Sequence, residues 1–188
     1  TGAGGDIGLQ SDGPIAIEGG RIVAESAAFP QRLQGLDGGQ GGSILVSTSA
    51  TLAMAQVLIT SSAFNTARGG DIFLSADGGI ATTGGEIRAL TTGSGQGGYV
   101  GLLTPADIAI ADTRFETSTF GQGNAGTVTV SAGGNLAVAD AGFVTNAEGA
   151  DKAGNAGGIL TSSGGDTTIA RTSFSGLSRG PGDGGFLD

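Results

Sequence analysis

Short runs in which apolar residues alternate with small or polar ones recur along the whole chain. In residues 125–143, Val128 and Val130 alternate with threonines, and Leu136 and Val138 alternate with an asparagine and an alanine. Alternation with a period of two indicates β-strands with one buried face. The same pattern returns 28 residues earlier, and again 28 residues before that. The chain is therefore a tandem repeat, and the repeat predicts its fold.

The repeats align at three apolar positions in each turn. The first position holds Ile7, Ile44, Ile72, Val100, Val128, Ile159 and Phe186. Eight residues after the first six of these markers stand Ile15, Leu52, Ile80, Ile108, Leu136 and Thr167. Fifteen residues after the same six stand Ile22, Ile59, Ile87, Phe115, Phe143 and Phe174. Because nearly all of these residues are apolar, they predict three short strands per turn, each with an inward face.

No single repeat can bury its own apolar face, so the repeats must stack on one another. We predict an all-β fold, a right-handed parallel β-helix of about six turns of ~28 residues, with no helix. It forms one domain over residues 1–188. The turns begin near residues 5, 42, 70, 98, 126 and 157, and a partial turn covers 184–188. Successive phenylalanines in the third position are expected to stack.

Glycine makes up 40 of the 188 residues, and Gly-Gly or Ala-Gly pairs precede the first strand of each turn. We interpret these glycines as corner residues with positive φ. Length varies only at the third corner, where residues 29–40 and 148–154 contain insertions. Insertions in a solenoid fall in loops on one face, so these loops are its most variable surface.

Composition narrows the possible functions. A formal net charge of −9 at pH 7 disfavours binding to nucleic acid or to anionic membranes. No apolar run approaches the roughly 18 residues that a membrane span needs, so membrane insertion is not expected. Carbohydrate-cleaving β-helices need clustered carboxylates and aromatic platforms, whereas this chain has no His, no Trp and one Tyr. We expect neither an enzyme nor a cofactor, and the absence of cysteine excludes disulfides.

Two polar patterns suggest ligand sites, each with a structural alternative. Asp107, Asn135 and Asp166 occupy one column on successive turns. They could form a weak site for a cation or for sugar hydroxyls, or they could cap the corner by hydrogen bonding to backbone amides. Residues 38–44 imitate the opening of a calcium-binding nonapeptide repeat, but Ser43 stands where aspartate is required.

Small or apolar residues also occupy outward positions. One outward column reads Ala53, Ala81, Ala109 and Ala137, and it predicts a flat contact strip. Leu45 and Phe73 face outward on adjacent turns and predict a second contact surface. At the ends, we expect the Phe186 turn of one copy to stack on the Ile7 turn of the next, because no capping device is evident.

The segment 118–130, Ser-Thr-Phe-Gly-Gln-Gly-Asn-Ala-Gly-Thr-Val-Thr-Val, resembles the repeat junction of filamentous-haemagglutinin-like exoproteins. Residues 151–158 are a looser second copy. The resemblance implies a β-helix secreted by a two-partner system to the bacterial cell surface, where it acts in adhesion or forms fibres. An adhesive role also implies a cell-surface or glycan ligand, while the uncapped ends described above predict self-association or continuation in a longer chain. A carbohydrate-binding or carbohydrate-cleaving β-helix is the alternative.

Overall fold

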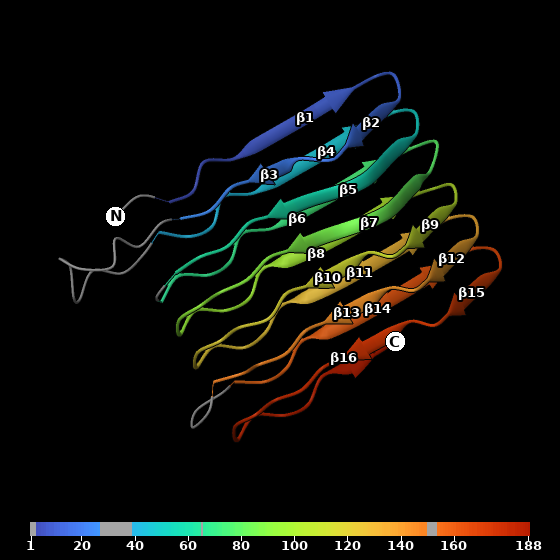
Figure 1. Ribbon diagram of the computed structural model, residues 1–188. Coiled ribbons are helices and arrows are strands. Elements are labelled where there is room, and N and C mark those ends of the chain that lie inside the picture. Colours follow the sequence, from blue (N-terminus) through green and yellow to red (C-terminus); the bar gives the residue numbers. More distant parts are fainter. Residues whose placement is uncertain (1–2, 27–38, 65, 150–153) are drawn as a thin grey trace.

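A computed structural model describes residues 3–26, 39–64, 66–149 and 154–188. These residues form an all-β structure, without a helix in any of the four ranges. Parallel strands coil repeatedly and stack into a β-solenoid of about five turns, ~28 residues apart (Figure 1). This confirms the predicted all-β, parallel β-helical fold, with about five turns where the sequence predicts six. Residues 27–38 of the first turn lie outside the described ranges.

The strands follow the repeat closely in chain order. They are β1 (Ile7–Ser11), β2 (Ile15–Glu18), β3 (Arg21–Val23), β4 (Ile44–Thr48), β5 (Leu52–Thr60), β6 (Ile72–Ala76), β7 (Ile80–Arg88), β8 (Tyr99–Thr104), β9 (Ile108–Ala111), β10 (Arg114–Glu116), β11 (Thr127–Ala132), β12 (Leu136–Ala139), β13 (Gly142–Val144), β14 (Gly158–Ser163), β15 (Thr167–Ala170), β16 (Ser173–Ser175) and β17 (Phe186–Leu187).

The strands belong to two sheets, which we call sheet A and sheet B. Sheet A has the order β1-β4-β6-β8-β11-β14-β17 and contains the first strand of every turn. Sheet B contains the second and third strands, and these fuse into one long strand in β5 and again in β7. The three predicted strands per turn are therefore distinct in most turns, but two of them share a sheet.

Inward side chains stack in register along the rod. Ile44 pairs with Ile72, and Ile72 with Val100, in sheet A. The third column ends in three aromatic rings: Phe143 lies 4.9 Å from Phe115 and 5.1 Å from Phe174 between ring centroids, nearly parallel to both. The predicted phenylalanine stack is confirmed, and these columns form the hydrophobic core.

The last turn corrects one predicted marker. β17 pairs with β14 so that Phe186 lies opposite Gly158 and Leu187 lies opposite Ile159. Leu187, and not Phe186, therefore continues the inward column. The Phe186 ring faces outward and covers Gly158, where a side chain would collide with it.

The glycines before the first strands serve a different purpose from the one predicted. Among the described glycines, positive φ occurs at Gly19, Gly20, Gly79, Gly84 and Gly85 and not at these corners. Instead, the corner glycines stack directly on one another along the rod axis. From the second turn onward, a Cβ atom added at the second residue of each pair would lie well inside van der Waals distance of the carbonyl oxygen one turn earlier, as at Gly42, Gly70, Gly98, Gly126, Gly157 and Gly185. Close backbone approach therefore excludes every larger residue at these six positions.

A second column bends sheet B between the second and third strands. The residue at one position there has left-handed backbone geometry in every turn: Gly19, Gln56, Gly84, Asp112, Asp140 and Arg171, with φ between 48° and 69°. Only two of the six are glycine, although glycine adopts this conformation most readily. The bend recurs because strand register repeats it in every turn, whatever the residue type.

The third corner is held by buried hydroxyl groups. Isolated parallel bridges link Ala63, Thr91, Thr119, Ala147 and Ser178 from turn to turn. The Thr91 hydroxyl donates to the carbonyl of Gln96 at 2.6 Å and accepts from the Gly69 amide at 2.9 Å. The two predicted insertions, residues 29–40 and 148–154, lie mostly outside the described residues, which leave out 27–38 and 150–153.

Candidate functional surfaces

Asparagine and aspartate side chains connect successive turns. The Asp107 carboxylate accepts a hydrogen bond from the backbone N–H of Asn135 at 2.6 Å. The side-chain oxygen of Asn135 in turn accepts one from the backbone N–H of Asp166 at 2.9 Å. The same arrangement pairs Asp6 with Ser43, Asp71 with Tyr99, Asn124 with Asn155, Asn155 with Asp183, and Asn146 with Leu177. The capping alternative thus accounts for the Asp107, Asn135 and Asp166 column.

Replacing Asn135 by alanine should lower the free energy of unfolding by about 1 kcal/mol, because the Asp166 amide loses its acceptor. Urea unfolding followed by circular dichroism measures the change. Added Ca²⁺ should leave the melting temperature of the parent protein unchanged. A Ca²⁺-dependent rise that Asn135→Ala abolishes would instead restore the cation site.

The predicted alanine strip exists as an exposed column on the outer face of sheet B. Ala53, Ala81, Ala109 and Ala137 pair in register on consecutive turns. A shallow hollow of about 250 Å³ lies over the last three, flanked by a second column of small residues. The strip is uncharged, as predicted, and its role in contact stays a prediction.

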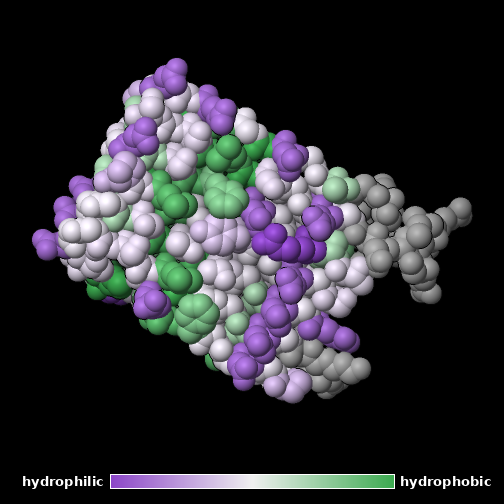
Figure 2. All heavy atoms as spheres, turned by 180° about the vertical axis from the view of Figure 1, so that it is seen from behind, coloured by the Kyte–Doolittle hydropathy of each residue, from purple (hydrophilic) through white to green (hydrophobic). Residues whose placement is uncertain are grey.

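Leu45 and Phe73 do lie side by side on the outer face of sheet A, where they are paired residues of β4 and β6. Leu45 is half-buried, whereas Phe73 is 38% exposed. The Phe73 ring packs against Tyr99, with 5.2 Å between the ring centroids and a 39° tilt. Tyr99 in turn lies over Gly101, which leaves room for its ring. Figure 2 shows apolar side chains gathered in patches on one face of the rod.

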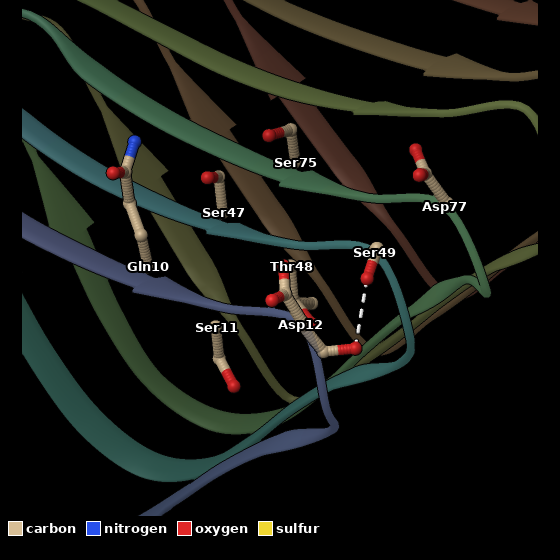
Figure 3. Close-up of a pocket in the computed structure, with 8 residues that line it drawn as sticks. All are labelled: Gln10, Ser11, Asp12, Ser47, Thr48, Ser49, Ser75 and Asp77. Atoms are coloured by element: carbon tan, nitrogen blue, oxygen red, sulfur yellow. Dashed lines mark hydrogen bonds between the residues drawn. The ribbon is translucent and has the colours of Figure 1, made fainter.

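A polar hollow of about 540 Å³ lies beside this patch, at the end of sheet A in the first three turns. We call it the serine hollow; it is lined by Gln10, Ser11, Asp12, Ser47, Thr48, Ser49, Ser75 and Asp77 (Figure 3). Sequence reasoning missed it because its residues are scattered over three repeats. The signal that could have found it is the outward column three residues after each marker, which begins with Gln10, Ser47 and Ser75.

Charged side chains pair with one another on sheet B. Arg88 contacts Glu86 on its own strand, and Arg114 lies 3.3 Å from the largely buried Glu116. Near the last turn, Arg171 forms a two-pronged ion pair with Asp140, at 2.6 Å for each contact. Hydrogen bonds from Arg171 lower the pKa of Asp140 and, reciprocally, raise the pKa of Arg171. These residues pair with one another rather than converge on a site.

The predicted end residues lie at opposite ends of the described stack. Ile7 begins β1, which pairs with β4 alone, and its side chain is half-buried. Phe186 is 60% exposed, but its ring faces outward and is not an end surface. The core residues exposed at the ends are instead Leu9 at the first turn, and Ile169 and Leu187 at the last.

Among the described residues, no group of three or more His, Cys, Asp or Glu side chains is placed to hold a metal ion. Nor does the described part of the chain contain a helix long and apolar enough to cross a membrane. The described part of the predicted calcium-like segment, residues 39–44, leads into β4.

Comparison with models of protein families, with curated proteins and with solved structures gives no match. The fold itself consists of parallel coils about 28 residues apart, with strands in two sheets. By that fold, the chain is a β-solenoid repeat protein.

Proposed function

We propose that this chain is a segment or subunit of an extracellular fibre on the bacterial cell surface, of the filamentous-haemagglutinin type. It acts as structural or adhesive material and associates end to end, without enzymatic activity. The resemblance of residues 118–130 to that family's repeat junction supports the assignment to a secreted surface protein.

One observation carries the structural role: the parallel register continues from β1 to β17 without a break. In the described residues, β1 has a neighbouring strand on one side only. Core residues beside such free edges are left partly exposed, with Leu9 at 42% and Leu187 at 57%. Free strand edges with apolar residues beside them pair readily with other strands. A further set of turns at each end, from a second copy or a longer chain, would cover the strand edges and the apolar residues beside them.

Sedimentation velocity over a range of protein concentrations tests end-to-end association. We expect the mass to rise with concentration, and electron micrographs to show rods that lengthen at constant width. A protein that stays monomeric throughout would contradict the proposal.

A matched pair of variants locates the contact at β1. The backbone N–H of Ile7 donates to the carbonyl of Ser43, and the carbonyl of Ser11 accepts from the backbone N–H of Ser49. Because successive residues of a strand direct their backbone groups to opposite sides, the N–H of Gly8 points away from β4, to the unpaired edge of β1. Gly8→Pro removes that donor and should abolish association while leaving the β1–β4 pairing and the melting temperature nearly unchanged. Gly8→Ala, which has open space for its methyl group, should associate like the parent protein.

A further inference from the structure

We propose that the serine hollow and the adjoining Phe73 ring form a binding site for a neutral oligosaccharide. The inference rests on the adhesive role proposed above and assigns it a place and a ligand class. The site lies on the outer face of sheet A and shares no residue with the column of Asp107, Asn135 and Asp166.

The hollow contains polar groups that the protein itself does not use. The hydroxyls of Ser11, Thr48 and Ser49 are bonded to backbone groups at the corner. By contrast, five other lining side chains make no hydrogen bond or ion pair within the described residues: Gln10, Asp12, Ser47, Ser75 and Asp77. Amide, hydroxyl and carboxylate groups together offer donors and acceptors to vicinal sugar hydroxyls.

The free groups are also regularly spaced. Gln10 pairs with Ser47, and Ser47 with Ser75, so the three side chains form one outward row across β1, β4 and β6 (Figure 3). Neighbouring strands lie about 4.8 Å apart, a step similar to the length of one sugar ring. An extended oligosaccharide laid along the rod could therefore meet one polar group per unit.

An aromatic platform adjoins this row. Phe73 lies two residues before Ser75 on the same face of β6, and its ring is braced by Tyr99. The apolar face of a sugar ring can pack on such an aromatic ring while its hydroxyls reach the serines. The combination distinguishes this site from the alanine strip, which offers no polar group at its centre.

Charge selects among sugars. Asp12 and Asp77 line the hollow from the first and third turns, and none of the described residues that line it is cationic. The whole chain carries a formal net charge of −9. Sulfated or sialylated chains would therefore be repelled, whereas neutral chains would not.

The protein carries its own reporter, since Tyr99 is its single tyrosine and tryptophan is absent. Tyrosine fluorescence, excited at a wavelength that phenylalanine does not absorb, thus reports on the platform alone. We would titrate the full chain with cellohexaose, maltohexaose and mannohexaose, and separately with a heparin hexasaccharide and with Ca²⁺. A saturable change of Tyr99 emission with at least one neutral hexasaccharide, and none with heparin or Ca²⁺, is expected.

Variants test where the oligosaccharide binds. Phe73→Ala, and separately the double variant Gln10→Ala with Ser75→Ala, should each weaken the affinity about tenfold or more. Thr83→Ala, an exposed change on sheet B in the same turn as Phe73, should leave the affinity unchanged. Thermal melts confirm that all variants fold.

Three results would overturn the proposal: no response to any of the neutral hexasaccharides at millimolar concentration, a response to heparin or Ca²⁺ alone, or equal affinity in parent and site variants. Each leaves the sedimentation result unaffected. Failure of the glycan site is therefore distinguishable from failure of the end-to-end rod.

Discussion

Ile108→Asp should prevent the chain from folding. Ile108 is 1% exposed and stacks between Ile80 and Leu136 in the second inward column. An aspartate there would place a carboxylate in the core without a partner, at a penalty of about 4 kcal/mol or more. A loss of that size or larger removes most of the stability of a domain at the lower end of the usual range of about 5–15 kcal/mol. Circular dichroism should show loss of β-structure and of the cooperative thermal transition.

The adjacent residue provides a matched control. Ala109 follows Ile108 on β9 but points outward, between Ala81 and Ala137. Ala109→Asp introduces the same carboxylate into water and should lower the stability by less than about 1 kcal/mol. If both variants melt alike, the inward and outward register of sheet B described above is wrong.

Gly126→Ala is expected to have the second largest effect. The new methyl group would overlap the carbonyl oxygen of Gly98, which belongs to the backbone of the preceding turn and cannot move independently. The Gly126 amide also donates to Thr117 at 2.7 Å, which fixes the position further. Relieving the overlap means spreading two turns, so we expect a loss of about 3 kcal/mol or more in urea unfolding.

Gly5→Ala tests the cause of that loss. Gly5 occupies the same column in the first turn, where nothing lies within 4 Å of an added Cβ. We expect a change of less than about 0.5 kcal/mol. If glycine served only to provide backbone freedom, the two substitutions would be equally damaging. A difference between them supports close stacking of the turns as the reason for glycine.

The core could be read from the sequence because apolar residues repeat at a nearly constant interval. That spacing placed Ile44, Ile72 and Val100 in one column, as the strand pairing confirms. The predicted marker Phe186 is wrong because the larger apolar side chain there is one residue out of register with the inward column. The glycine pair of each turn precedes its marker by two residues, as Gly5 precedes Ile7, and the same rule gives Leu187.

Other features of the structure cannot be recognised from the residue types at their positions. The left-handed column contains Gln56, Asp112 and Arg171, which share no chemical property that would single them out. Close stacking and positive φ both require glycine, so composition cannot separate them. The serine hollow combines common polar residues from three repeats, and it becomes visible only when the outward columns are aligned.

The asparagine and aspartate bonds between turns give the rod a direction. Every one of these side chains accepts from the turn that follows it in the sequence, as Asn135 does from Asp166. The last turn of the stack, which we call the leading face, therefore presents carboxylates without amide partners, such as Asp166 and Asp183. The described part of the first turn, the trailing face, presents no such carboxylate in these columns. Two leading faces brought together would set carboxylate against carboxylate. Joined rods should thus all run the same way, and any fibre made from them would have two chemically distinct tips.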